Sequence, residues 1–253
     1  MTVAGLGATL PGGVSSPIEL AAEAGRAALI DAGLTPDDVT ALTYTGTHSS
    51  YTSQSMPVAD LIGRKLGLDE APYVASFDLP ADGAGVLSAI VVGGSLLHDT
   101  SDVVLVTSAD EYSGPYGHGL SVRPGQAVGT ALVLRGSRTP ATDATASKSR
   151  EVGIRTDDAR RRWVTSREQN LVDNVLRTLP PELPLVVCAP DDVDLPAGAI
   201  RVGPRGHTAT PILGLLQARA AGHRRVAFVA AGTGQQVSAT ICELVPHTAD
   251  PSR

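Results

Sequence analysis

The sequence has few aromatic residues. Phe, Trp and Tyr together make up 3% of the 253 residues, although hydrophobic residues as a whole make up 42%. A chain of this composition can bury a substantial core, which excludes a disordered protein. That core must be built from Ala, Val, Leu, Ile and Gly, and such side chains favour closely packed α/β layers.

Cysteine is also scarce. The chain has two cysteines, Cys188 and Cys242, which provide neither a disulfide framework nor the paired spacing of a metal site. We therefore expect no bound metal and no organic cofactor. The pair Gly5 and Gly7 suggests a dinucleotide-binding loop, but the third glycine of that fingerprint would fall at Leu10, and Pro11 prevents the helix that must follow.

Long hydrophobic runs and an excess of positive charge are absent as well. The longest apolar stretch, Val86–Leu97, is too short and too rich in glycine to span a membrane. The formal net charge is −6, which disfavours binding along a nucleic-acid backbone. The first residues show no basic region followed by an apolar run, so no signal peptide is expected. We expect a cytoplasmic protein without a membrane or nucleic-acid partner.

Hydrophobic periodicity and capping residues predict helices that alternate with strands, which is typical of βαβ units and a mainly parallel sheet. Helices are predicted at 17–31, 57–66, 84–97, 165–179 and 208–221. Strands are predicted at 3–8, 39–46, 73–77, 102–109, 126–134, 185–188, 199–202, 225–231 and 236–245.

The order of elements repeats within the chain. In each half a buried helix precedes a strand, at 103–108 or 226–231, and a glycine- and glutamine-containing turn leads to a long closing strand. This pattern indicates an internal duplication. We expect an N-terminal half at 1–135, a linker or surface excursion rich in Ser, Thr and Ala at 136–153, and a C-terminal half at 154–253.

The stretch Asp78–Ile90 connects a predicted strand to a small-residue helix through a sharp turn. Many enzymes place a nucleophile at such a turn, because the helix N-terminus favours an anion and lowers the pKa of a thiol. The sequence here is Asp78-Leu-Pro-Ala-Asp-Gly-Ala-Gly-Val86, which contains no nucleophile. The turn is therefore predicted without the residue that would carry covalent chemistry.

This stretch resembles the thiolase superfamily, and within it the ketosynthase III branch, which has Asp-Val-Ala-Ala-Ala-Cys-x-Gly-Phe at this point. Three further segments resemble motifs of that branch, and a fourth, Gly232-Thr-Gly-Gln-Gln236, matches its glycine-rich C-terminal turn. The three segments are Val103-Val-Leu-Val-Thr-Ser-Ala-Asp-Glu111, Gly125-Gln-Ala-Val-Gly-Thr-Ala-Leu-Val-Leu134 and Gly206-His-Thr-Ala209. The resemblance covers about residues 3–245. It implies an α/β fold of two duplicated halves, layered α-β-α-β-α.

The resemblance also places the catalytic positions of the family. The catalytic Cys falls on Gly83, and the catalytic His of the motif Val-Val-Pro-His-Gln falls on Ala189. His207 occupies the third position, where family members have Asn or His. Condensation needs a thiolate to hold the acyl chain and donors to stabilise the oxyanion and enolate. Only His207 retains a usable side chain, so the resemblance implies a protein that keeps the fold and has lost the chemistry.

Each remaining candidate has a structural alternative. His207 is either a donor to a carbonyl oxygen or a helix-terminal His bonded to backbone. Asp82 is an auxiliary acid or base, or more simply a helix N-cap. Cys188 pairs with His207 as a relocated nucleophile, or is a small apolar filler within a strand. The run Arg160–Arg162 contacts an acidic carrier protein or a phosphopantetheine, or is a solvated surface.

Two functions follow. The first is a non-catalytic ketosynthase III-like subunit in polyketide or fatty-acid-type biosynthesis, which pairs with an active ketosynthase as chain-length factors do. The resemblance implies dimerisation through the strand at 73–77, with an intact ketosynthase-like chain in a heterodimer or heterotetramer, or with a second copy. The alternative is an acyltransferase or thioester hydrolase that uses His207 and acts on acyl carrier protein or acyl-CoA. The first hypothesis explains both lost residues at once, so we favour a protein that is not an enzyme.

Overall fold

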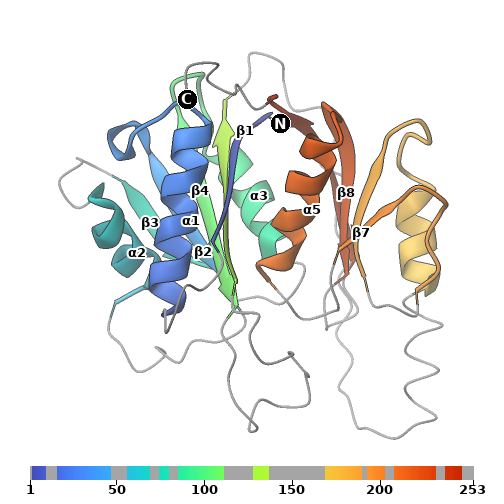
Figure 1. The fold of residues 1–253 in the computed structure, drawn as a ribbon, viewed down its shortest axis with the longest axis horizontal. Helices are drawn as coiled ribbons and strands as arrows, with labels where there is room; N and C mark the ends of the chain where they lie inside the picture. Colours follow the sequence, from blue (N-terminus) through green and yellow to red (C-terminus); the bar gives the residue numbers. More distant parts are fainter. Residues whose placement is uncertain are drawn as a thin grey trace, which may run out of the picture.

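The computed structural model of the protein describes residues 2–9, 16–46, 56–68, 74–79, 85–110, 128–136, 169–189, 193–202, 208–231 and 237–246. Helices and strands alternate along these stretches, as the sequence predicts (Figure 1). Within them, no helix is long and apolar enough to cross a membrane.

The described strands form one mixed sheet of nine strands in the order β3-β2-β4-β5-β1-β9-β8-β6-β7. The first part of the chain supplies β1 (Thr2–Thr9), β2 (Ala41–Thr45), β3 (Ala75–Asp78), β4 (Val103–Asp110) and β5 (Val128–Arg135). The second part supplies β6 (Leu185–Cys188), β7 (Ile200–Val202), β8 (Arg225–Ala231) and β9 (Val237–Leu244). β3 and β7 are the edges of this sheet.

Strand pairing confirms that the two parts are duplicates. β2 pairs in parallel with β3 and β4, and β4 pairs antiparallel with β5. β6 repeats this arrangement with β7 and β8, and β8 pairs antiparallel with β9. β1 lies between the two sets, antiparallel to β5 and parallel to β9 over Thr2 and Val3. Most of the expected linker lies outside the described residues, so the boundaries at 135 and 154 remain predictions.

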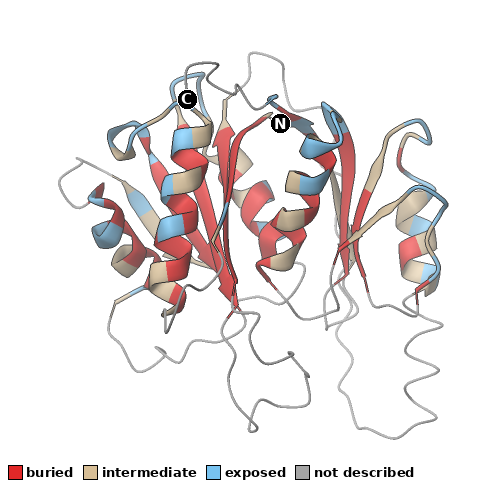
Figure 2. Ribbon diagram, viewed as in Figure 1, coloured by how far each residue is buried: buried red, intermediate tan, exposed pale blue. Residues whose placement is uncertain are grey.

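Three apolar clusters show the predicted layers. The inner cluster lies between the two halves and contains side chains of α3 (Gly85–Ser95) and α5 (Thr210–Ala220) together with both parts of the sheet. A second cluster packs α1 (Pro17–Asp31) and α2 (Val58–Leu66) against the outer face of the N-terminal strands. A third packs the helical residues 169–176 against β6 and β8. Figure 2 shows the resulting buried stripes on the helices and strands.

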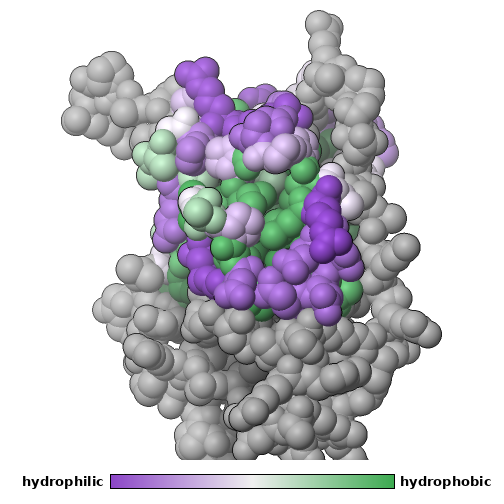
Figure 3. Space-filling model, turned by 90° about the vertical axis from the view of Figure 1, so that its right-hand side faces the viewer, coloured by the Kyte–Doolittle hydropathy of each residue, from purple (hydrophilic) through white to green (hydrophobic). Residues whose placement is uncertain are grey.

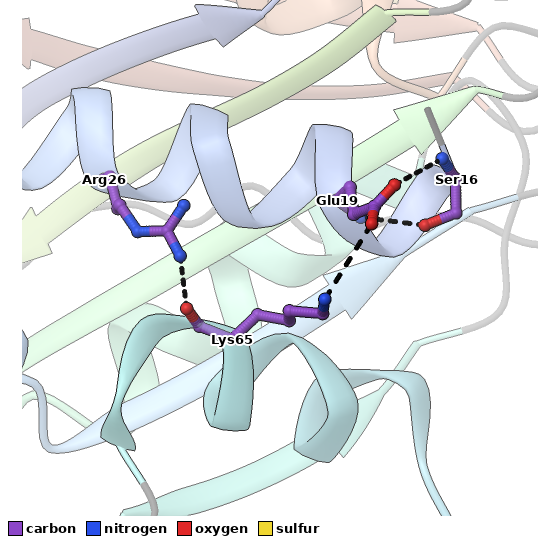
Figure 4. A network of polar contacts seen from close by, with 4 residues as sticks. All are labelled: Ser16, Glu19, Arg26 and Lys65. Atoms are coloured by element: carbon purple, nitrogen blue, oxygen red, sulfur yellow. Dashed lines mark hydrogen bonds and ion pairs between the residues drawn. The ribbon is translucent and has the colours of Figure 1, made fainter. Parts of the chain in front are cut away.

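Helix α1 begins where the sequence predicts because Ser16 and Glu19 form a capping box before and after Pro17. The Ser16 hydroxyl accepts from the Glu19 amide at 3.2 Å, and the Glu19 carboxylate accepts from the Ser16 amide at 3.0 Å. These hydrogen bonds, backbone first, hold the pKa of Glu19 below its usual value, with a smaller contribution from Lys65. Lys65 of α2 lies 3.8 Å from Glu19, and Arg26 donates to the Lys65 carbonyl, which links the two helices (Figure 4).

The glycines of β1 have a packing role. A Cβ at Gly5 would lie 2.1 Å from the Ala28 carbonyl oxygen, and one at Gly7 would lie 2.1 Å from that of Ala24. Both carbonyls belong to α1, so the two glycines allow the helix backbone to approach the strand directly. This close approach explains the Gly5–Gly7 pair that otherwise suggests a dinucleotide loop.

Figure 3 shows the side of the molecule that Figure 1 draws on the right, where the C-terminal edge strand β7 lies. Hydrophobic residues gather in the middle of this face and hydrophilic residues surround them. Ile200 of β7 and Leu213 and Leu216 of α5 are among the half-buried side chains that pack on the inner cluster. Because β7 has only three residues, this edge leaves few backbone groups open to pairing.

Candidate functional site

Asp110 joins the two halves at the segment predicted to carry the site. This last residue of β4 is 4% exposed, and its carboxylate accepts from the Thr208 amide at 3.0 Å, the Thr208 hydroxyl at 2.6 Å and the Ala209 amide at 2.8 Å. Helix α5 has no side-chain cap from its own N-cap residue, Ala209. Asp110 therefore satisfies amides at the start of α5 from a position about a hundred residues earlier in the chain.

Thr130 of β5 fixes the same segment from a second strand. Its hydroxyl donates to the Ala209 carbonyl at 2.8 Å, and both residues are fully buried. His207 lies outside the described residues, but the two residues that follow it are held by two N-terminal strands, by β4 through Asp110 and by β5 through Thr130.

Asp78 has an equivalent role at the start of the turn where the family carries its nucleophile. It ends β3, and its carboxylate accepts from the Val58 and Ala59 amides, each at 2.8 Å. Helix α2 begins at Val58, and its N-cap residue, Pro57, has no side chain that can cap. Asp78 thus caps a neighbouring helix, and its carboxylate anchors the entrance of the turn to α2. Asp82 and Gly83, further along this turn, lie outside the described residues.

Cys188 and Ala189 are both described, and both are fully buried, but their side chains pack on different faces of the sheet. Cys188 belongs to the inner cluster, whereas Ala189 belongs to the third cluster, which lies beneath the helical residues 169–176. The structure therefore does not bring a side chain at position 189 to the inner face. Cys188 lies on the inner face, and its pairing with His207 remains a prediction.

Neither cysteine is in a disulfide, although the structure describes both. Burial raises the pKa of the Cys242 thiol to about 12, so this thiol stays protonated at neutral pH. Within the described residues no group of His, Cys, Asp and Glu side chains is placed to hold a metal ion.

Sequence reasoning missed a row of hydroxyl side chains on the inner face of the N-terminal half. Thr45, Ser108 and Thr130 lie side by side on β2, β4 and β5, because Thr45 is in register with Ser108 and Ser108 with Thr130. All three are fully buried. We call these three residues the polar row. Alternation places Thr43 of β2 on the same face as Thr45.

Two hydroxyls on this face of β2, one of them in the polar row, lack partners among the described residues. Ser108 donates to the Thr45 carbonyl at 2.8 Å and Thr130 donates to Ala209, but the hydroxyls of Thr43 and Thr45 have no hydrogen bond there. Burying a hydroxyl without a partner costs about 1–3 kcal/mol. The only sequence signal was a strand with Thr at alternate positions, which indicates a strand but no function.

The duplicated sheet and the inner helix layer are those of a thiolase-like fold, the fold of solved ketosynthase III-type structures. No protein-family model matches the sequence, and no curated protein matches it. Solved structures do match across nearly the whole chain, and they agree with the resemblance that the sequence motifs carry.

Three of these structures illustrate the match. AbyA1, a tetronic acid condensing enzyme, superposes with a TM-score of 0.68 at 19% identity over 95% of this chain and 98% of that chain. The 3-oxoacyl-acyl-carrier-protein synthase III of Aquifex aeolicus VF5 gives 0.68 at 17%, over 95% and 98%. A variant of OleA from Xanthomonas campestris gives 0.73 at 15%, over 95% and 97%. At such identities the match establishes the fold, and the activity has to be argued from the site.

Proposed function

We propose that the protein is a non-catalytic ketosynthase III-like subunit that pairs with an active ketosynthase in polyketide or fatty-acid-type biosynthesis, as chain-length factors do. The observation that carries this proposal is Ala189. The sequence resemblance assigns this position to the catalytic His of the family motif, and the Ala189 side chain is fully buried in the cluster beneath the helical residues 169–176. Together with Gly83 at the position of the nucleophile, this leaves condensation without two of its three groups.

The edge strand β3 supports the pairing. It has a partner on one side only, β2, and its residues are half-buried or exposed. Helix α3, which follows it in the chain, carries Val91 at 50% exposure. An open strand edge and an exposed apolar side chain are each features that another chain can cover. We propose that β3 and α3 together contact the ketosynthase, in the cytoplasm.

The test is co-expression with an intact ketosynthase III-type enzyme of the same organism, followed by affinity purification and sedimentation. We expect a heterodimer or heterotetramer, or a self-dimer when the ketosynthase is absent. Val91→Glu should weaken the association. Ile30→Glu is the matched control, because Ile30 is 72% exposed on α1 and lies on neither β3 nor α3. A monomer in the presence of the ketosynthase would overturn the proposal.

The alternative function, an acyltransferase or thioester hydrolase, needs a nucleophile. Cys188 is fully buried in the inner cluster, which offers no direct access to a thioester. Intact-mass spectra after incubation with acyl-CoA or acyl carrier protein separate the two functions. A non-catalytic subunit leaves the mass unchanged, whereas a covalent acyl group on Cys188 would support the alternative.

A further inference from the structure

We propose that Asp60 of helix α2 makes the β3 edge selective between partners. The edge favours a chain that presents a basic side chain to Asp60, and it disfavours a second copy of this chain. The inference rests on the proposed function, in which β3 contacts the ketosynthase, and it adds the chemistry of the partner that this edge accepts.

The contact lies on the outer face of β3, on the side that α2 covers (Figure 1). Ser76 and Asp78 are in register with residues of β2 that belong to the second cluster, which packs on this outer face. Residues directly opposite each other on neighbouring strands share a face of the sheet. Ser76 and Asp78 therefore point to the side where α2 packs.

Asp60 brings a negative charge to this face. It lies in the first turn of α2, is half-buried, and its carboxylate accepts from the Ser76 hydroxyl. Within the described ranges Asp60 forms no ion pair, and Arg64, one turn further along α2, is exposed and not paired with it. Asp78 differs, because its carboxylate accepts from two backbone amides at the start of α2, and that helix end compensates part of its charge.

Pairing with a second copy brings this charge close to another carboxylate. A two-fold axis perpendicular to the sheet makes β3 antiparallel to its copy and keeps the two outer faces on one side. The two registers that pair most of β3 place Ser76 opposite either Ser76 or Asp78 of the copy, with Cβ atoms about 4.5–5.5 Å apart. Because each Asp60 contacts its own Ser76, both registers bring Asp60 near a carboxylate of the copy. Like charges so placed destabilise the pair and act against self-association.

The same geometry indicates which partner fits. A Lys or Arg on the outer face of the facing strand forms an ion pair with Asp60 across the edge. The inner face of β3 requires an apolar contact, because alternation places Ala75 and Phe77 there. Phe77 is half-buried and has a neighbouring strand on one side only. The partner is therefore a ketosynthase strand with basic side chains on its outer face and apolar side chains on its inner face.

Sedimentation of the full-length chain, alone and with the co-expressed ketosynthase III-type enzyme, tests the inference through Asp60→Asn. Asn keeps an oxygen that can accept from Ser76 and removes the charge. We expect self-association to become roughly two- to fivefold tighter and association with the ketosynthase to become weaker by a similar factor, as expected for one charged cross-strand pair. For the wild type, added salt should strengthen the self-dimer and weaken the heterodimer, because it screens both the repulsion and the attraction.

Glu23→Gln is the matched control. Glu23 is exposed on α1 and lies on neither α2 nor β3, so this variant should change neither association. A purely structural role of Asp60 would move both associations in the same direction, and that result would overturn the inference. A wild-type self-dimer as tight as the heterodimer would also overturn it.

The test separates this inference from the proposed function. If Asp60→Asn changes neither association while the ketosynthase still co-purifies, the inference fails and the proposed pairing stands. A wild-type chain that associates with neither the ketosynthase nor itself would overturn the proposed function, and the selectivity with it.

Discussion

The carboxylate of Asp31 forms an ion pair with the guanidinium of Arg219, which connects the end of α1 to the last turn of α5. The two side chains are 7% and 11% exposed. The same carboxylate oxygen of Asp31 accepts from the Leu6 amide of β1 at 2.9 Å. β9 pairs with β1 only at Thr2 and Val3, so the Asp31 carboxylate takes the place of a strand partner further along β1.

Arg219→Met should therefore destabilise the fold strongly. It removes the guanidinium that pairs with the largely buried Asp31 carboxylate, and loss of one partner of a buried ion pair typically costs about 3–5 kcal/mol of unfolding free energy. Urea unfolding measures the change. Lys65→Met is the control, because it removes the exposed pair with Glu19, whose side chains are 56% and 46% exposed, and should have a far smaller effect. Equal effects of the two variants would contradict this role of Asp31.

Asp110→Asn should loosen the contact between the halves. The carboxylate of Asp110 accepts from the Thr208 amide with one oxygen and from the Ala209 amide with the other, whereas Asn has only one oxygen that can accept. Loss of a hydrogen bond to a charged group costs about 1.5–3 kcal/mol. Hydrogen exchange at the Thr208 and Ala209 amides should accelerate. Thr208→Val removes only the hydroxyl bond and should have a smaller effect on both amides. Unchanged exchange in Asp110→Asn would show that another group holds this segment.

Gly7→Ala should disrupt the packing of α1 on β1. Its Cβ would lie 2.1 Å from a helix carbonyl, which neither backbone can accommodate without moving, and overpacking of this kind costs about 1–3 kcal/mol or more. Gly25→Ala on α1 is the matched variant, since its Cβ would meet only Leu105 and Leu66 at 3.4 Å. That variant should be neutral or stabilising by up to about 1 kcal/mol, the helix preference of Ala over Gly. Thermal unfolding distinguishes the two.

Gly83→Cys should not restore condensation. Even if the new thiol ionised, position 189 would supply no donor to the developing oxyanion, and loss of one such donor costs on the order of 2.7–4 kcal/mol in the barrier. Adding Ala189→His should not restore condensation either, because the new side chain would enter the third cluster, on the face of the sheet away from the inner helices. Mass spectrometry of the reaction products checks this. Ketoacyl product above the wild-type background would show that the site is more complete than the sequence indicates.

Local signals explain why much of the fold could be predicted from the sequence. Helix α1 was predicted at its observed bounds because the residues that mark its ends, Ser16, Pro17 and Gly33, lie within two residues of those ends in the sequence. The third strand was predicted at 73–77 and lies at Ala75–Asp78, because it ends where Asp78 is in register with Tyr44 of β2. Such pairing depends on a distant strand, which local pattern does not reveal.

The candidate site could not be predicted in the same way, because it depends on contacts between residues that are still further apart in the sequence. Asp78 and Asp110 follow predicted strands, but nothing near them identifies the helices α2 and α5 that they cap. The polar row was missed for the same reason, since Thr45, Ser108 and Thr130 are neighbours only once β2, β4 and β5 are in register. The family resemblance predicted the duplicated halves, and strand pairing confirms them.

The contact between β1 and β9 has a consequence for biosynthesis. β1 is made first among the described strands and β9 last, yet they are neighbours in the middle of the sheet. On the ribosome, the N-terminal half can assemble early, but one edge of β1 waits until almost the whole chain has emerged. Contacts between such distant segments form slowly, and an unpaired strand edge favours aggregation meanwhile. Yield in cells should therefore depend on translation rate and chaperones more than the stability of the finished fold suggests.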